Sequence, residues 1–263
     1  MTNDERRTPE SDTKRYLTAA FRNREEREEL RALLTRGEIA MEGMVPWSSN
    51  YTYLVRIQLE EHSAYGIYKP QCGERPLWDF ETGSLCKREV AAYELSAFLN
   101  FPNVPVTILR DDAPQGLGMV QQFVDHKRRE NFFTLRDKCR AEMEKIAVFD
   151  ALINNTDRKG GHILADQNGT IWAIDHGVTF HQDPKLRTVI WDFIDEPIPD
   201  PLLEQLETLR VALKANEPIR ATLEKMLARS ELRALNQRLN ALLKERVYPT
   251  PPEDWPHIPW PPV

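Results

Sequence analysis

A change in residue pattern near residue 125 most limits what this chain can fold into. Between residues 39 and 124 the sequence is rich in aromatic and β-branched residues and is broken by short polar turns, a pattern typical of short strands. After Asp125 apolar residues recur at helical spacing. The pattern predicts an α+β chain whose first half is a mostly antiparallel sheet with one helix and whose second half is mainly helical.

The expected elements follow from this pattern. Strands are expected within residues 39–47, 51–59, 64–70, 104–112 and 117–125. Helices are expected at residues 16–36, ending near Gly37, and at 87–101, 141–153, 209–218 and 223–245. Asn168-Gly169 lies between two short apolar runs and predicts a β-hairpin within residues 162–177.

These elements divide the chain into four segments. We expect a flexible N-terminus over residues 1–15, an N-lobe with a leading helix over 16–124, a helical C-lobe with a hairpin over 125–248 and a Pro/Trp-rich tail over 249–263. Because proline has no backbone N–H, the tail is expected to be extended. We expect it either to dock on its own domain through Trp255 and Trp260 or to bind a partner.

Composition excludes several classes of protein. A chain of 263 residues with 41% hydrophobic content can close a core, which excludes global disorder. Its 35 Lys and Arg against 41 Asp and Glu give a net charge of −6, the wrong sign for a dedicated nucleic-acid binder. Three cysteines without close pairing predict neither a disulfide framework nor a four-ligand zinc site. Without an apolar leader or an apolar run of about 18 residues, we expect a cytoplasmic protein with no integral membrane association.

Three polar residues are expected to converge at the hairpin. Asp157 follows a buried helix, His162 comes five residues later, and Asp175 ends the return strand. Oxygen ligands from two places in a hairpin can hold a Mg²⁺ ion against nucleotide phosphates, because that ion takes few protein ligands and keeps water and phosphate for the rest. The alternative is that these residues only form caps and turns, for which Asn, Asp and Gly are also suited.

The first half supplies the remaining parts that phosphoryl transfer needs. Lys69 ends a predicted strand, and Glu89 lies one turn into the helix that follows. A cation on the α- and β-phosphates, held by a carboxylate, is a recurring feature of this chemistry. The turn over residues 43–50 is expected to present the amides and hydroxyls of Ser48, Ser49 and Asn50 to the phosphates.

Four motifs stand in the order in which one kinase superfamily carries them. They are Tyr68-Lys69-Pro70, Arg88-Glu89-Val90-Ala91-Ala92-Tyr93, Asn155-Thr156-Asp157-Arg158 and Ala173-Ile174-Asp175-His176-Gly177. Residues 43–191 resemble the phosphoinositide 3/4-kinase superfamily. Their residue pattern is most similar to that of type II phosphoinositide 4-kinases and more distantly similar to that of HipA-like kinases. Within the superfamily, the chain resembles a bacterial family. The resemblance implies a two-lobed protein-kinase-like fold with an antiparallel-sheet N-lobe and a mainly helical C-lobe.

The same resemblance implies the role of each motif in an ATP-dependent phosphotransferase. Lys69 would bind the α- and β-phosphates, Glu89 would pair with it, and Asp157 would act as the catalytic base or orient the nucleophile. His162 and Asp175 would bind Mg²⁺ or Mn²⁺. Relatives carry Asn five residues after the catalytic Asp, where this chain has His162, and imidazole binds Mn²⁺ or Zn²⁺ more readily than Mg²⁺.

Two further assignments depend on position. Arg158 is expected to neutralise Asp157 or the transferred phosphate, with a surface arginine as the alternative. The backbone of residues 121–124, including Gln122 and Val124, is expected to bind adenine where the lobes join. The side chains there give no evidence for or against this role.

The acceptor is unknown from the sequence. His181, Lys185 and Arg187 follow Asp175, where lipid kinases read an anionic head group, and they suit an acidic acceptor or a solvated surface. The chain lacks a cysteine-rich lipidation segment and a basic amphipathic helix, so a protein or small molecule is favoured over a lipid. Three alternatives stay open: an AMP transferase, a nucleotide-binding pseudokinase that serves as an interaction module, and a metal phosphohydrolase, which would leave Lys69 without a role.

Overall fold

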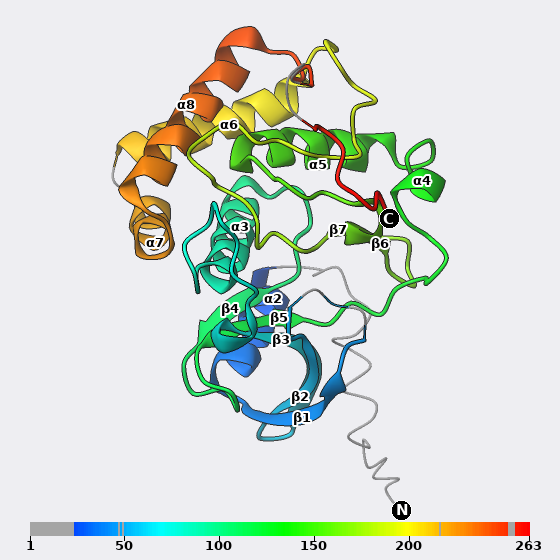
Figure 1. The fold of residues 1–263 in the computed structure, drawn as a ribbon, viewed down its shortest axis with the longest axis vertical. Coiled ribbons are helices and arrows are strands. Elements are labelled where there is room, and N and C mark those ends of the chain that lie inside the picture. The colour runs from blue at the N-terminus through cyan, green and yellow to red at the C-terminus, as the bar shows by residue number, and fades with distance from the viewer. Residues whose placement is uncertain (1–23, 47, 49, 216, 252–255) are drawn as a thin grey trace, which may run out of the picture.

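The computed structural model describes residues 24–46, 48, 50–215, 217–251 and 256–263. Within these residues the chain forms a sheet-rich N-lobe and a helical C-lobe (Figure 1). The predicted two-lobed α+β fold is confirmed. The N-terminus over residues 1–15, predicted to be flexible, lies outside the described residues.

Five antiparallel strands form the N-lobe sheet in the order β1-β2-β3-β5-β4. Their bounds are β1 (Glu38–Met44), β2 (Tyr53–Leu59), β3 (His62–Pro70), β4 (Thr107–Arg110) and β5 (Gly118–Gln122). Each lies where the sequence predicts a strand. β3 is paired on both sides, with β2 and with β5, so a side chain at its end has a rigid backbone beneath it.

Two helices pack on this sheet. α2 (Arg24–Arg36) buries Leu30, Leu33 and Leu34 and ends beside Gly37, where the sequence predicts its end. α3 (Leu85–Leu99) is buried on most of its circumference, because it lies between the sheet and the helical lobe (Figure 1). α3 is thus held by both lobes.

The C-lobe is built around α5 (Arg140–Ile153), which is buried over its last two turns. The other helices of this lobe are α4 (Phe132–Leu135), α6 (Asp200–Lys214), α7 (Pro218–Met226) and α8 (Arg229–Glu245). The helix predicted over 223–245 is divided, because Leu227 has an extended backbone and Glu231 accepts a hydrogen bond from the Ala228 amide at the start of α8. Within the described residues, no helix has the length and apolar character needed to cross a membrane.

The predicted hairpin forms from β6 (Ile163–Ala165) and β7 (Ile171–Ala173). Its turn is held by the Asp166 carboxylate, which accepts hydrogen bonds from the amides of Asn168 and Thr170. Gly169 takes the left-handed conformation that the turn requires (φ +87°). The hairpin carries its two ends, at His162 and Ile174, toward the N-lobe.

Candidate functional site

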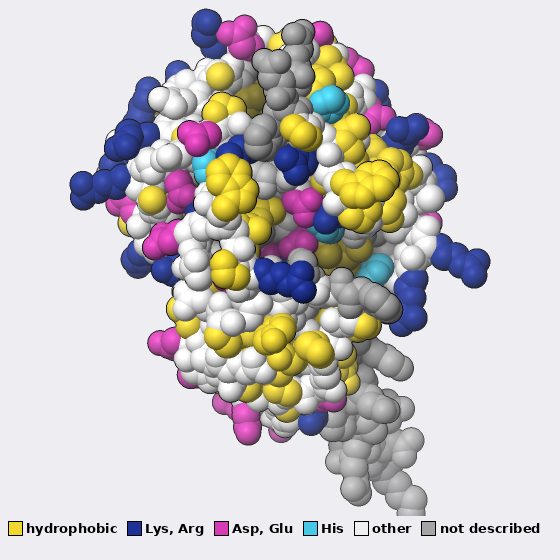
Figure 2. All heavy atoms as spheres, in the orientation of Figure 1, with side chains coloured by type: hydrophobic (Ala, Val, Ile, Leu, Met, Phe, Trp, Pro, Cys, Tyr) yellow, Lys and Arg dark blue, Asp and Glu magenta, His cyan; other side chains and the backbone are white. Residues whose placement is uncertain are grey.

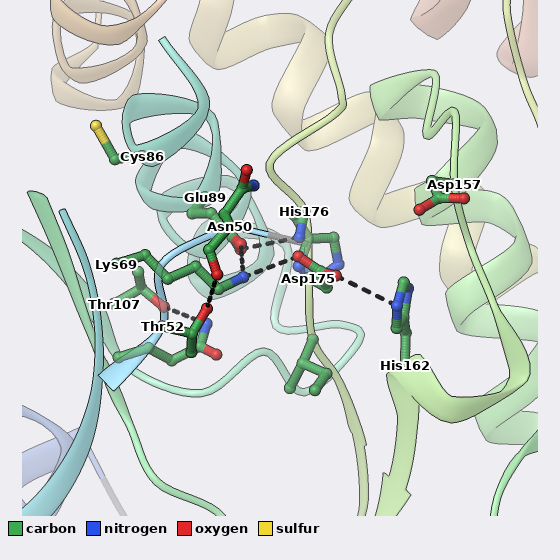
Figure 3. A network of polar contacts seen from close by, with 12 residues as sticks. Asn50, Thr52, Lys69, Cys86, Glu89, Thr107, Asp157, His162, Asp175 and His176 are labelled. Atoms are coloured by element: carbon green, nitrogen blue, oxygen red, sulfur yellow. Dashed lines mark hydrogen bonds and ion pairs between the residues drawn. The ribbon is translucent and has the colours of Figure 1, made fainter. Parts of the chain in front are cut away.

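Lys69 connects the two lobes through its side chain. Its Nζ lies 2.7 Å from Oε1 of Glu89 on α3 and 2.8 Å from Oδ1 of Asp175, which follows β7 (Figure 3). Gly118 of β5 makes the close pairing beneath Lys69 feasible, since a Cβ there would lie 2.5 Å from the Lys69 carbonyl oxygen. Residues separated by 106 positions in the sequence therefore meet at one ammonium group.

The charges of Lys69, Glu89 and Asp175 determine one another's protonation. Burial alone would lower the pKa of Lys69, but the carboxylates of Asp175 and Glu89 outweigh it and raise that pKa. Burial would raise the pKa of Asp175, but Lys69 and His162 hold it below its usual range. Burial raises the pKa of Glu89, and the contact with Lys69 opposes this rise. At neutral pH the lysine is a cation and Asp175 an anion.

The backbone at Asp175 has a conformation that few residues tolerate. Its φ of +61° lies in the left-handed region, which Asp and Asn enter more readily than most side chains. The next amide, His176 N, donates to Oε2 of Glu89 at 2.8 Å. Glu89 therefore accepts from both Lys69 and the segment after β7, and the strained turn aims Asp175 into the space between the lobes.

His162 supplies the second group beside Asp175. Its Nε2 lies 3.2 Å from Oδ2 of Asp175 (Figure 3). Burial lowers the pKa of His162 to about 4, although Asp175 opposes the shift, so the imidazole is neutral at physiological pH. A neutral imidazole and a carboxylate are both metal ligands.

This donor pair fits a cation that completes its shell elsewhere. Neighbouring ligands of an octahedral Mg²⁺ or Mn²⁺ lie about 3 Å apart, since each bond is about 2.1 Å long, and Nε2 and Oδ2 are separated by about that distance. No cluster of three or more His, Cys, Asp or Glu side chains that would enclose a metal exists among the described residues. The His162 and Asp175 pair thus suits an ion whose other ligands are phosphate oxygens and water. It does not suit an ion bound only by protein ligands.

Asp157 faces the same cleft but stands apart from the Lys69 contacts (Figure 3). Its backbone amide donates to Oδ1 of Asn155, and its Oδ2 lies 3.0 Å from Nζ of Lys159. Burial raises the pKa of Asp157, and Lys159 opposes that rise. The carboxylate is half-buried and accessible to a group that enters the cleft.

The structure corrects both expectations for Arg158. Its guanidinium is fully buried and does not contact Asp157; it pairs with Asp150 of α5, with Nε 2.9 Å from Oδ2. It also donates to the Ile174 carbonyl and lies 2.7 Å from Nε2 of His176. Arg158 is therefore neither a surface residue nor a neutraliser of Asp157. Its buried guanidinium joins the loop that carries Asp157 to α5 and to the end of β7 before Asp175.

The turn after β1 and the segment that joins the lobes contribute less than expected. Gly43 belongs to β1. Ser48 is exposed, Ser49 lies outside the described residues, and Asn50 lines the cleft while its Oδ1 accepts from the Arg75 amide.

Two backbone groups of the joining segment already have partners. The Gln122 amide donates to the Val106 carbonyl, and the Val124 carbonyl lies 3.1 Å from Nδ1 of His126. These groups are not open to adenine as they stand, and a role of this segment in base binding remains a prediction.

Sequence reasoning missed two carboxylates that shape the site. Glu74 lines the cleft and accepts hydrogen bonds from the Leu85 and Cys86 amides, so it caps the start of α3. Asp150 anchors Arg158. A charged residue on the buried side of an otherwise apolar helix was the available signal for Asp150; no local pattern marks Glu74, which lies in an irregular loop.

Two of the three basic residues after Asp175, His181 and Lys185, are buried. Nζ of Lys185 lies 2.5 Å from Oδ2 of Asp79, and a ring nitrogen of His181 lies 2.9 Å from the Asp79 carbonyl oxygen. Both side chains are buried, and Arg187 donates from Nε to the Pro256 carbonyl. The expectation of a solvated basic surface is wrong for His181 and Lys185, because the loop before α3 covers them.

A hollow between the lobes contains the site. Figure 2 shows acidic, basic and histidine side chains gathered in the middle of one face, bordered by hydrophobic ones. The hollow is lined from both lobes by Asn50, Lys69, Pro70, Glu74, Leu85, Cys86, Glu89, Asp157, Asp175, Gly177 and Val178. Every carboxylate and the lysine discussed above for phosphate and metal chemistry face this one space.

Comparison with known proteins agrees with this arrangement. The model of the phosphatidylinositol 3- and 4-kinase family matches residues 21–248, which include nearly all of both lobes. The chain belongs to this family. Protein Rv2133c of Mycobacterium tuberculosis (strain ATCC 25618 / H37Rv) is 36% identical over 270 residues, which cover 89% of this chain and 96% of that protein.

Solved kinase structures share the fold of this family member. The Golgi casein kinase superposes with a TM-score of 0.57 at 14% identity, covering 93% of this chain and 81% of that one. Its structure with Mn/ADP bound gives the same TM-score and identity over 89% and 80% of the two chains. At this level of identity the likeness shows the fold, and the predicted kinase-like fold is confirmed.

Proposed function

We propose that this family member transfers a phosphoryl group from ATP to an acceptor, in a reaction that needs a divalent cation. The observation that carries the proposal is the meeting of Lys69, Glu89 and Asp175 in one cleft between the lobes. Besides joining the lobes, the ammonium group of Lys69 lines the hollow and is partly exposed there. It is suited to a phosphate chain, which brings its own negative charge and needs a metal beside it.

The residues have separate tasks in this proposal. Lys69 binds the α- and β-phosphates and Glu89 holds the lysine in place, while His162 and Asp175 hold Mg²⁺ or Mn²⁺. The cation neutralises charge on the phosphates when it is bound. The Golgi casein kinase structure with Mn/ADP bound supports this pairing of nucleotide and metal on the same fold.

Asp157 acts on the acceptor in this proposal. It orients the acceptor hydroxyl and takes its proton, for which a raised pKa is favourable because the carboxylate is then a stronger base. Little covalent work is needed from the protein, since phosphoryl transfer depends mainly on positioning and on neutralisation of charge. Arg158 takes no direct part and holds the loop that carries Asp157.

A protein or small-molecule acceptor is favoured over an inositol lipid. The basic residues that would read an anionic head group, His181 and Lys185, are buried against Asp79. The family description names phosphatidylinositol kinases, so a lipid acceptor is the direct competitor. A radiolabelled transfer assay with phosphatidylinositol vesicles alongside protein and small-molecule extracts separates these acceptors.

Labelled ATP tests the reaction type. The chain is incubated with γ-labelled or α-labelled ATP in Mg²⁺ and, separately, in Mn²⁺. Transfer of γ-label to an acceptor, abolished in Lys69→Met, is the expected result. Transfer of α-label would replace this proposal with AMP transfer.

One observation favours a second candidate. His162 stands where related kinases have Asn, and imidazole is a poor ligand for Mg²⁺. A nucleotide-binding pseudokinase that serves as an interaction module would show thermal stabilisation by nucleotide without turnover in either metal. Turnover in Mn²⁺ but not in Mg²⁺ would instead support a kinase with an altered metal preference.

A further inference from the structure

The C-terminal segment 256–263 lies against the loop that carries the candidate catalytic residues. The end of the chain runs past α5 and finishes beside β6 and α4 (Figure 1). The Gly160 amide donates to the Pro262 carbonyl at 2.7 Å, and the Thr188 amide donates to the His257 carbonyl at 3.0 Å. The described part of the tail thus meets the loop after Asp157 and the segment around Thr188.

Side chains add to this contact. Nε1 of Trp191 donates to the His257 carbonyl at 3.1 Å, and the two rings pack edge to face with centroids 5.8 Å apart. Nε of Arg187 donates to the Pro256 carbonyl at 2.9 Å. Trp260, expected to dock the tail, is instead 88% exposed, and Trp255 lies outside the described residues.

The tail accepts hydrogen bonds in these contacts and donates none, and its proline content explains this. A proline-rich segment has few N–H groups but keeps every carbonyl, so it serves mainly as an acceptor. In the four contacts above, the tail accepts and the loop or the segment around Thr188 donates. Donors that would otherwise need water as a partner are thereby satisfied by the tail.

These donors are linked directly to the site. The Arg158 amide donates to the Arg187 carbonyl and the Val189 amide donates to the Arg158 carbonyl, both at 3.0 Å. Gly160 lies between Lys159, which pairs with Asp157, and His162, which contacts Asp175. The segment 187–189 is therefore held between the catalytic loop on one side and the tail on the other.

We propose that the tail is a positioning element for the metal side of the site: residues 256–263 fix the loop 158–162 so that His162 faces Asp175. This inference rests on the proposed function, because it assigns the tail to the metal site of that reaction. The tail contacts neither Lys69 nor Glu89 among the described interactions. The tail therefore affects the affinity of the site for the divalent cation and does not affect nucleotide binding in the absence of metal.

Two variants and a control test this inference. One variant ends the chain at Thr250, and the other, Trp191→Phe, removes the indole donor while it keeps an aromatic ring. Trp260→Phe is the matched control, because that tryptophan is exposed. ADP binding is titrated by calorimetry without metal and at increasing Mn²⁺, and amide hydrogen exchange is followed over residues 158–162 and 187–191.

The expected result is specific to the metal. Loss of groups that orient a metal ligand weakens metal affinity by about 10–100-fold, so the truncated chain should need at least about tenfold more Mn²⁺ to reach the same ADP affinity. Trp191→Phe should show a smaller shift in the same direction. Metal-free ADP affinity and exchange in β3 should be unchanged, while the Gly160 and Thr188 amides should exchange faster in the truncated chain.

Three results would overturn the inference. Unchanged exchange at Gly160 and Thr188 would mean that the tail does not brace the loop. Faster exchange with an unchanged Mn²⁺ requirement would reduce the tail to a structural cover. Higher turnover after truncation would make the tail a barrier to the acceptor.

The controls separate failures of other kinds. If the truncated chain does not fold, Trp191→Phe decides the question alone. If the full chain binds no ADP with Mn²⁺, the proposed function fails, and the exchange data still report whether the tail orders the loop.

Discussion

At the scale of single residues, Lys69 is held by ion pairs to two carboxylates, one from each lobe. Its ammonium group touches Glu89, which is almost fully buried, and Asp175. The interaction favours the charged form of all three groups. In the proposed function the lysine therefore serves both stability and nucleotide binding, and the two roles can be separated by substitution.

Lys69→Met should lose both properties. Removing one partner of a buried ion pair costs about 3–5 kcal/mol, because Glu89 is left buried and unpaired. Loss of the phosphate ligand should lower turnover by about 100-fold or more. Urea denaturation and the γ-label assay measure the two effects.

Two further variants separate these effects. Adding Glu89→Gln to Lys69→Met should restore part of the stability and none of the activity. Arg56→Met, which breaks an exposed ion pair on β2, should change stability by less than about 1 kcal/mol and leave activity intact. Full activity in Lys69→Met would remove the lysine from the mechanism.

The pH dependence of turnover should report Asp157. Burial raises its pKa, and the base must be ionised, so activity should fall on the acid side at a pH above the ordinary range of an aspartate. Lys159 lowers the same pKa, so Lys159→Met should move the acid limb to still higher pH. A pH profile of kcat/KM for the two chains measures this shift. An acid limb that does not move, or that moves to lower pH, would show that Asp157 is not the titrating base.

At the scale of elements, the loop over residues 154–162, which carries Asp157 and His162, is fixed by a buried ion pair and not by a regular α-helix or strand. Arg158 joins the loop to α5 through Asp150 and to the strand end at Ile174, and Asp150 also accepts from Nδ2 of Asn155. Neither member of the pair is exposed. Backbone hydrogen bonds to residues 187–189 and to the C-terminal segment add to this anchor.

Arg158→Leu should therefore destabilise the protein by about 3–5 kcal/mol, since a buried carboxylate is left unpaired. Urea denaturation measures the loss. The double variant Asp150→Asn with Arg158→Leu should recover part of it, because the remaining amide carries no charge. An unchanged denaturation midpoint in Arg158→Leu would mean that the pair is not what holds the loop.

Local sequence patterns predicted most of the elements but only some of the contacts between them. The helix expected at residues 209–218 is wrong, because α6 ends at Lys214 and α7 begins at Pro218. The strand ending at Lys69, the helix with Glu89 and the hairpin that leads to Asp175 each lie within a short periodic segment, so their existence could be inferred. The role of Arg158 depends on Asp150, which lies on another element, and the cover over Lys185 comes from Asp79, 106 positions away. Periodicity reports which face is buried and cannot identify such partners.

At the scale of the whole molecule, the account depends on two lobes that share one cleft. α3 is tied to the C-lobe by Arg88, whose guanidinium donates to the Thr179 carbonyl and to Glu231 of α8 at 2.5 Å. The neighbouring Glu89 pairs with Lys69 of the N-lobe, which also contacts Asp175 of the C-lobe. α3 thus takes part both in the contact between the lobes and in the candidate site, and the order of the four motifs in the sequence could not by itself establish that.

Metal-dependent nucleotide binding tests this account most directly. The measurement is the melting temperature of the wild type and of Asp175→Asn with ATP, with and without Mn²⁺. Asn suits the variant because it keeps the size of Asp and tolerates a positive φ. At about 100 times the dissociation constant a ligand adds about 2.7 kcal/mol, and each kcal/mol raises the melting temperature by about 2–4 °C.

The wild type should therefore gain about 5–10 °C with ATP and Mn²⁺ together. Asp175→Asn should gain no more with Mn²⁺ than without it. An equal metal-dependent gain in the variant would contradict the assignment of Asp175 and, with it, the shared cleft as the nucleotide site.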